Sequence, residues 1–356
     1  MSKRISISTY CTPTSHGSIL QAYALKQKLL SMGCDSCINF WYNKKQPKDY
    51  LRECKIKNIK DVIVNLYLFL KKDKLVKQYS KSQKFIDERI DIKYFNNYES
   101  LRDNIEEYDY YLSGSDQVFN PISCFPTFFL DFAKEREKRI TYAVSMGTTN
   151  IPQKNEDRFS KYLNNFDYIS VREKDNCEII KKYSNANTTV NIDPTFLLSV
   201  EQWRQLECPY TIKEPYILIY SIYWDKKINK EVMALHKKTG LKVYVLSTGL
   251  NRVWGNKKIF DAGVQEFLWL IDHAKYIITS SFHGVAMSTI FNKQFSAVID
   301  PSKPSRIKGL FDTLEIDNIP IEDLSDKSIE YDKVNANIKT EQIRSDNYLR
   351  QVLKIG

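Results

Sequence analysis

The sequence predicts an α/β protein built from two Rossmann-like domains with a cleft between them. Short runs of β-branched and aromatic residues alternate with polar turns and amphipathic helices, which is the pattern of parallel βαβ units. The alternation stops at a connecting segment, residues 201–214, and begins again at residue 216. A chain of 356 residues is also longer than one ordinary hydrophobic core supports. Two domains follow from these observations.

The expected elements set the domain boundaries. In the first half we expect strands at residues 4–8, 108–113, 140–145, 168–171 and 189–192, and helices at 18–31, 157–165 and 174–182. In the second half we expect strands at 216–222, 242–247, 276–279 and 295–299, and helices at 227–239, 265–273 and 285–291. The predicted domains are therefore 1–200 and 201–330. Residues 331–356 form a C-terminal segment whose helix packs back on the first domain.

Composition and charge restrict the kind of partner. The chain carries 53 Lys and Arg against 43 Asp and Glu, a net charge of +10, which indicates anionic partners or a lysine-rich solvated surface. The first residues enter a strand directly, and the longest apolar run, 62–70, is shorter than the roughly 18–20 residues that span a bilayer. We expect a cytoplasmic protein. Its seven scattered cysteines, Cys34 and Cys37 included, predict reduced thiols and no metal site.

A basic helical insertion is expected at about residues 55–89. Its apolar residues Val62, Leu66, Phe69 and Leu70 alternate with lysines. Two interpretations stay open. The segment packs on the first domain with solvated lysines, or it makes peripheral contact with the inner face of an anionic membrane.

Five polar turns follow predicted strands. They are residues 114–117, 172–173, 193–195, 280–284 and 300–306. Ligands of open α/β sheets bind outside the carboxyl ends of the strands, so these turns predict a site in the cleft between the domains.

The turn at 280–284 is the mouth of the predicted anion site. Gly284 allows close backbone approach, and the helix that follows presents free N–H groups and the positive end of its dipole. One serine, Ser280 or Ser281, is expected to cap this helix. A protonated histidine gains nothing from that dipole, so His283 is predicted to be a phosphate ligand or general acid.

Charged residues in the other turns complete the predicted site. Arg172 is placed to clamp an anion or, alternatively, to pair with Glu173 or Asp175. Arg306 and Lys308 add positive potential. Asp116 can present its carboxylate to a hydroxyl or form an Asx turn. His16, in another strand-to-helix loop, is a weaker candidate. Walker A, Gly-x-Gly-x-x-Gly and Gly-x-Ser-x-Gly sequences are absent.

These turns resemble those of the polysaccharide pyruvyl transferase family, which has a GT-B-like fold of two Rossmann-like domains. The matching segments, in order, are GSILQAYAL at 17–25, LSGSDQVFNP at 112–121, SVRE at 170–173, DPTFLL at 193–198, SSFHG at 280–284 and SRI at 305–307. The Ser-Phe-His-Gly form resembles a large subgroup, whereas better-studied members carry Arg-Leu-His at the positions of Ser281, Phe282 and His283.

The resemblance implies transfer of pyruvate from phosphoenolpyruvate, as co-substrate and without a bound cofactor, onto two hydroxyls of a sugar in a surface-glycan precursor. The acceptor would be lipid-linked or nucleotide-linked. The implied donor-binding residues are Arg172, Ser281, Gly284 with the N–H groups after it, Arg306 and Lys308. His283 would be the acid or phosphate ligand, and Asp116 would orient or deprotonate the acceptor hydroxyl. Residues with an acceptor-binding or structural role would be Asp193, Ser115, Gln117 and His16.

Two other functions remain open. One is a GT-B glycosyltransferase that uses a nucleotide sugar, for which Glu266 and Asp272 are the available acidic residues. The other is a non-catalytic binding protein of glycan assembly. No interleaved Arg/aromatic platform is visible in the sequence, so we expect no nucleic-acid partner.

Overall fold

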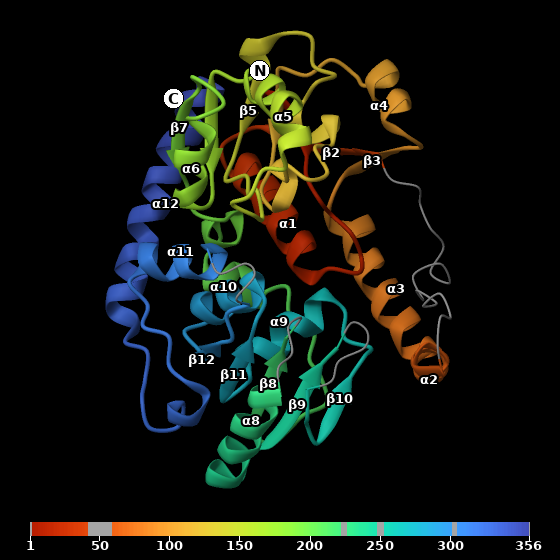
Figure 1. Ribbon diagram of the computed structural model, residues 1–356, viewed down its shortest axis with the longest axis vertical. Coiled ribbons are helices and arrows are strands. Elements are labelled where there is room, and N and C mark those ends of the chain that lie inside the picture. The colour runs from red at the N-terminus through yellow and green to blue at the C-terminus, as the bar shows by residue number, and fades with distance from the viewer. Residues whose placement is uncertain (1, 42–58, 222–225, 248–252, 301–304, 356) are drawn as a thin grey trace.

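The computed structural model describes residues 2–41, 59–221, 226–247, 253–300 and 305–355. Its two lobes each contain a parallel five-stranded sheet flanked by helices (Figure 1). The predicted loop at residues 300–306 and the start of the predicted insertion, 55–58, lie largely or wholly outside the described residues.

The first sheet has the strand order β3-β2-β1-β4-β5. Its strands are β1 (Arg4–Ser8), β2 (Asp35–Trp41), β3 (Ile92–Phe95), β4 (Tyr110–Ser113) and β5 (Arg139–Thr141). A parallel pair, β6 (Tyr168–Val171) and β7 (Asn187–Val190), joins its edge through single bridges of Val144 to Asp116 and to Val171. The edge strand β5 ends earlier than predicted, and the residues after it turn toward the site.

Helices surround this sheet and extend beyond it. They are α1 (His16–Ser31), α2 (Ile59–Leu70), α3 (Lys72–Arg89), α4 (Tyr98–Asn104), α5 (Glu156–Leu163), α6 (Lys174–Ile180) and α7 (Val200–Arg204). Short 3-10 turns occupy η2 (Gln117–Phe119), η3 (Pro126–Phe129), η4 (Arg136–Lys138), η5 (Gln153–Asn155) and η6 (Pro194–Leu197). The predicted helical insertion is two helices, α2 and α3, of which α3 packs against α1.

The second sheet has the order β10-β9-β8-β11-β12, all parallel. Its strands are β8 (Tyr216–Tyr220), β9 (Lys242–Leu246), β10 (Lys257–Ile259), β11 (Tyr276–Thr279) and β12 (Gln294–Ala297). The helices are α8 (Lys226–Thr239), α9 (Val264–Asp272), α10 (Phe282–Ile290), α11 (Ser305–Leu314) and α12 (Tyr331–Leu353), with a 3-10 turn η7 (Ile321–Asp323). The long helix α12 begins nine residues before the predicted 340–354 and runs along both lobes (Figure 1).

α12 joins the end of the chain to the first lobe. The Tyr348 hydroxyl donates to the Thr141 carbonyl at 2.9 Å, and the Lys28 ammonium pairs with Asp346 at 2.5 Å. Asn191 donates to the Ser345 hydroxyl at 3.4 Å. These bonds hold α12 across the strand ends that form one wall of the site.

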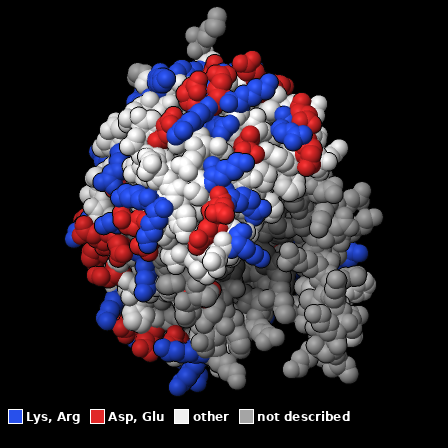
Figure 2. Space-filling view, turned by 45° about the horizontal axis from the view of Figure 1, so that its top comes forward, with Lys and Arg blue, Asp and Glu red and all other residues white. Residues whose placement is uncertain are grey.

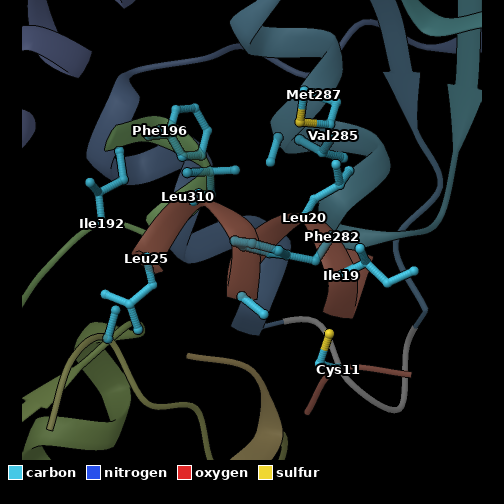
Figure 3. Close-up of a cluster of buried hydrophobic side chains, with 14 of the residues drawn as sticks. Cys11, Ile19, Leu20, Leu25, Ile192, Phe196, Phe282, Val285, Met287 and Leu310 are labelled. Carbon is cyan, nitrogen blue, oxygen red and sulfur yellow. The ribbon is translucent and has the colours of Figure 1, made fainter. Parts of the chain in front are cut away.

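Apolar side chains fill the space between the lobes (Figure 3). From the first half, Ile19 and Leu20 on α1 and Phe196 in η6 contribute; from the second half, Val285 and Met287 on α10 do so. All five are fully buried. Burying apolar surface contributes about 25 cal/mol of stabilising free energy per Å². This layer therefore stabilises the docking of the two lobes.

Charged residues are mixed in sign on the face drawn in Figure 2, where Lys and Arg alternate with Asp and Glu. The net charge of +10 is therefore not gathered into one patch on that face. Among the described residues, no helix is both long enough and apolar enough to cross a membrane.

Candidate active site

The turn after β11 is capped by its own serine. The Ser281 hydroxyl accepts the Gly284 N–H at 3.4 Å, and the Ser281 carbonyl accepts the Val285 N–H at 3.0 Å. These bonds already use the N–H groups of Gly284 and Val285, two of those that the prediction assigns to the donor. Within this helix start, the amides of Phe282 and His283 precede the capped ones and are the ones left for an anion.

Gly284 is required by packing rather than by a ligand. A Cβ atom at Gly284 would lie 2.2 Å from Oγ1 of Thr279, the last residue of β11. That hydroxyl donates to the Tyr220 carbonyl at 2.6 Å and is fixed in place. The glycine therefore lets α10 fold back tightly onto the end of its own strand, which aims His283 at the first lobe.

His283 lies at the boundary of the two lobes. Its Nε2 is 3.8 Å from Oδ2 of Asp193 and, within the described part of the chain, has no hydrogen-bond partner. On its other side, a Cβ atom at Gly17 would fall 2.1 Å from its Nδ1, so α1 of the first lobe touches the ring directly. Burial lowers the pKa of His283, while the carboxylates of Asp193 and Asp116 act in the opposite direction.

Arg172 follows β6 and is held by two carboxylates. Its Nε donates to Glu173 at 3.0 Å and its Nη1 donates to Asp193 at 2.9 Å. Burial alone would lower the pKa of Arg172, but the charges of Glu173 and Asp193 outweigh it and raise that pKa. The buried Nη2 has no partner among the described residues. The ion-pair interpretation and the anion-clamp interpretation are thus compatible, because one donor remains for a ligand.

Asp193 is held by hydrogen bonds of its own and contacts Arg172 and His283. Its Oδ1 accepts the N–H and the hydroxyl of Thr195 at 3.0 and 2.8 Å, and its Oδ2 accepts the Ser115 hydroxyl at 3.0 Å. The carboxylate is fully buried. Burial raises its pKa, but the neighbouring His283 and Arg172 lower it further than burial raises it. Asp193 and Ser115 therefore position Arg172 and His283.

Phe282 lies next to two arginines. The guanidinium carbon of Arg172 is 3.9 Å from the ring centroid and that of Arg306, on α11, is 5.6 Å away. The Nε of Arg306 is buried and has no partner among the described residues. Burial lowers the pKa of Arg306, and the nearby positive charge of Arg172 lowers it further. Two cations at one aromatic face, each with a free donor nitrogen, form a site for an anion.

A pocket opens at these two arginines. It is lined by Arg172, Val190, Asn191, Ile192, Asp193, Phe282, Arg306, Gly309, Leu310, Thr313 and Glu341. The last of these comes from α12 and pairs with Arg344 at 2.9 Å. The pocket therefore combines strand ends of the first lobe, the start of α10, α11 and the terminal helix.

Asp116 has a strained backbone and faces the same charges. Its φ of 75° is in the left-handed region, and its carboxylate accepts the Gln117 N–H at 2.8 Å. Its negative charge acts to raise the pKa values of His283, Arg172 and Arg306. Gln117 itself packs against Gly147, where a Cβ atom would meet its Oε1 at 2.2 Å.

Of the predicted site residues, Arg172, Asp193 and Arg306 line the pocket, whereas Ser115, Asp116, Gln117, Ser281, His283, Gly284, Lys308 and His16 are not among its lining residues. Lys308 is exposed on α11. His16 is fully buried at the start of α1, stacks on Phe267 at 4.9 Å between ring centroids, and contacts the Ala262 carbonyl through Nε2 at 3.2 Å. The geometry gives His16 a structural role, because it links the first lobe to the second.

His16 makes stability depend on pH. Burial lowers the pKa of His16 from 6.5 to about 4, although the Ala262 carbonyl opposes the shift. The neutral form is the one the fold accepts, so the stabilisation is complete above pH 6.5 and is lost as pH falls toward 4. The loss is on the order of 3 kcal/mol. Urea unfolding at several pH values should show it, and His16→Gln should flatten this limb. An unchanged limb in the variant would assign it to other groups.

Some site residues had no signal in the sequence. Phe282 belongs to the SSFHG segment, but its position against two arginines depends on the turn after β6 and on α11, which are far apart in the sequence. Glu341 reaches the pocket only because α12 crosses the lobes. Gly17 also stood in a motif, and its contact with His283 depends on how the lobes dock.

A further acidic group lies in the second lobe. Glu207, Asp272 and His273 bring one ligand atom each within 4.8 Å of one another. The Arg204 guanidinium already donates to both oxygens of Asp272, at 2.8 and 3.2 Å. Arg204 therefore supplies the positive charge that balances these acidic side chains.

Comparison with solved structures identifies the fold. UDP-GlcNAc 2-epimerase from Methanocaldococcus jannaschii matches with a TM-score of 0.54 at 11% identity, over 100% of both chains. UGT89C1 from Arabidopsis thaliana, complexed with quercetin, matches with a TM-score of 0.51 at 10% identity, over 99% of this chain and 100% of the other. The UDP-GlcNAc 2-epimerase from Neisseria meningitidis, bound to UDP-GlcNAc, matches with a TM-score of 0.50 at 11% identity, over 100% and 95%. The chain has the GT-B fold.

Comparison at the level of sequence identifies the family. A search of curated proteins finds no match to the chain. The family model for polysaccharide pyruvyl transferase matches residues 16–301, a span that begins at the start of α1 and includes the turns carrying Asp116, Arg172 and His283. The chain therefore belongs to the polysaccharide pyruvyl transferase family and is a transferase.

Proposed function

We propose that the protein transfers pyruvate from phosphoenolpyruvate onto two hydroxyls of one sugar, forming a cyclic ketal in a surface-glycan precursor. The observation that carries this proposal is a pair of guanidinium nitrogens, Arg172 Nη2 and Arg306 Nε, whose residues line one pocket and which have no partner within the described residues. Phosphoenolpyruvate carries a carboxylate and a phosphate, and both are groups that arginine binds through planar, charge-assisted hydrogen bonds.

The reaction requires a proton donor and an acceptor for a proton. One sugar hydroxyl oxygen bonds to C2 of phosphoenolpyruvate while C3 takes up a proton and becomes a methyl group. The second hydroxyl oxygen then bonds to C2, and the bond between C2 and the phosphate oxygen breaks, so phosphate leaves. The proton of the second hydroxyl goes to the phosphate or to solvent. His283 is the proposed acid, and Asp116 is the proposed acceptor of the hydroxyl proton. In support of this assignment, His283 Nε2 lies 3.8 Å from the same Asp193 carboxylate that pairs with Arg172.

The Ser281 position need not carry a cation for this chemistry. Better-studied members with the Arg-Leu-His sequence would hold an arginine where Ser281 caps α10. In this chain, Arg172 and Arg306 already supply two positive charges beside Phe282. We infer that the Ser-Phe-His-Gly form defines a subgroup in which those two arginines hold the donor.

A nucleotide-sugar glycosyltransferase is less well supported. Such an enzyme would need a free carboxylate in the second lobe to bind the ribose of the nucleotide sugar. Glu266, the best candidate, accepts the Gly263 N–H at 3.0 Å and pairs with Lys81 of α3. Asp272 is bound by Arg204. Both acidic side chains are thus engaged in contacts that hold the lobes and the end of α9.

Calorimetric titration separates the candidates. We expect phosphoenolpyruvate to bind and UDP-GlcNAc and UDP to bind far more weakly. Arg306→Met is expected to weaken phosphoenolpyruvate binding by at least about tenfold, the loss of one charge-assisted contact. Arg204→Met, which removes an arginine at the end of α7 that does not line the pocket, is the matched control. Binding of UDP-GlcNAc alone would overturn the proposal, and binding of phosphoenolpyruvate without phosphate release across a panel of sugars would favour the non-catalytic function.

A further inference from the structure

Helix α2 exposes an apolar face in the described part of the chain. The exposed fractions of Val62, Leu66, Phe69 and Leu70 are 45%, 58%, 67% and 69%. They account for four of the ten large hydrophobic residues exposed in the described part of the chain. Their spacing of four, three and one residues places them on one side of a helix. Exposed apolar residues gathered in this way mark an interaction surface.

The opposite side of α2 is anchored to the protein. The ring of Tyr67 lies 6.1 Å from that of Phe260, which follows β10 in the second lobe. The Lys71 ammonium lies near both rings, 6.0 Å from one centroid and 5.9 Å from the other. These contacts fix the rotation of α2, so the apolar face points away from the body of the protein.

A cluster of lysines borders this face. Beyond Lys71, which lies over the anchoring rings, Lys72, Lys74 and Lys77 follow in α3, with Asp73 as the one acidic residue among them. Within the described residues, none of these three lysines forms an ion pair with a carboxylate, whereas farther along α3 Lys81 pairs with Glu266 and Lys84 with Glu88. Apolar side chains bordered by unpaired lysines suit a surface that is apolar inside and anionic outside.

We propose that α2 and the first turns of α3 dock on an anionic lipid bilayer, with Leu66, Phe69 and Leu70 inserted among the acyl chains and the lysines on the lipid phosphates. Charge complementarity favours a bilayer over a second copy of this chain, because two copies of the same basic face would repel each other. Net charge of +10 supports the same attraction at longer range.

Helix α3 joins this surface to the start of α1. Gln78 on α3 donates to the Pro13 carbonyl at 3.1 Å and contacts His16 at the start of α1. At 1.5 Å per residue, Lys72 and Gln78 are about 9 Å apart along the axis of α3. Figure 1 shows α2 at the far end of α3, projecting beyond the lobes on the side away from α11 and α12. A bilayer on α2 would therefore contact the protein beyond the end of α3, away from the pocket that α11 and α12 line.

Co-sedimentation of the full chain with vesicles tests the proposal. We expect binding to phosphatidylcholine vesicles that contain phosphatidylglycerol, weak binding to phosphatidylcholine alone, and a decrease as salt is raised. Phe69→Asp with Leu70→Asp should lower the bound fraction at least tenfold, and Lys74→Glu with Lys77→Glu should do so as well. Ile343→Asp, at a site of similar exposure on α12, is the matched control and should bind like the parent.

Several outcomes would overturn the proposal. Equal binding by the parent and Phe69→Asp/Leu70→Asp would mean that the apolar face does not insert. A parent that is dimeric by light scattering, and becomes monomeric with these aspartates without having bound vesicles, would assign the face to self-association. Circular dichroism and the thermal midpoint verify that the variants are folded. Because vesicle binding is measured without substrate, its failure would leave the proposed transferase reaction untouched, and the converse also holds.

Discussion

Replacing His283 with glutamine is expected to lower the rate of phosphate release from phosphoenolpyruvate by about 10²–10⁴-fold, the usual contribution of a positioned general acid. Glutamine keeps most of the volume and the hydrogen-bonding capacity of the ring but cannot deliver a proton. The thermal midpoint should change little, because Nε2 of His283 has no hydrogen-bond partner among the described residues to lose. The measurement is phosphate release with whichever sugar of the panel supports turnover.

The pH dependence gives a second readout of the same residue. Burial lowers the pKa of His283 in the free protein, so little of it is protonated at neutral pH. Binding of the trianionic donor adds negative charge beside the ring and raises that pKa. We therefore expect kcat/KM to fall as pH rises through the free-protein pKa, and kcat to fall at a higher pH. His283→Gln should remove both limbs. A variant that keeps more than a tenth of the activity, or that unfolds at much lower temperature, would show the histidine to be structural.

Arg172→Met is expected to abolish phosphoenolpyruvate binding and to cost about 3–5 kcal/mol of unfolding free energy. The stability cost arises because the fully buried Asp193 and the buried Glu173 would lose the cation that neutralises them. Urea unfolding and calorimetric titration measure the two effects separately.

A second substitution distinguishes the structural and binding roles of Arg172. Arg172→Met combined with Glu173→Gln removes one of the uncompensated charges, so it should recover part of the stability and none of the binding. Arg204→Met serves as the control for binding, since Arg204 pairs with Asp272 and does not line the pocket. Recovery of phosphoenolpyruvate binding in the double variant would show that Arg172 only supports the fold.

The order of elements could be predicted from the sequence because it depends on local patterns. Short strands such as β11 depend on neighbouring residues, and the sequence predicts this strand at its position. The same is true of the helix cap, which the sequence predicts at Ser280 or Ser281 and the structure places at Ser281. The edge strand β3 and helix α11 were not expected. β3 is short and only partly buried, so it lacks a strong apolar run, and α11 begins just after residues 301–304, outside the described part of the chain.

The site was harder to predict than the fold because its chemistry depends on distant contacts. Arg172 stood beside Glu173 in sequence, which left the ion pair and the anion clamp equally plausible. Only the structure shows that Asp193, twenty-one residues away, binds Nη1 of Arg172 and that Nη2 has no partner among the described residues. Similarly, Gly284 indicated a close approach, but the atom approached is the Thr279 hydroxyl.

The contact of Gly17 with His283 has a consequence for how the protein could evolve. The second lobe supplies the proposed acid, His283, and the backbone of Gly17 in the first lobe contacts its ring. There is no room for a methyl group at Gly17. The contact between the Gly17 backbone and the His283 ring thereby limits how closely the lobes can approach here. We therefore expect a sequence change that alters lobe docking to move His283, so that the surrounding residues diverge mainly through substitutions that preserve this spacing.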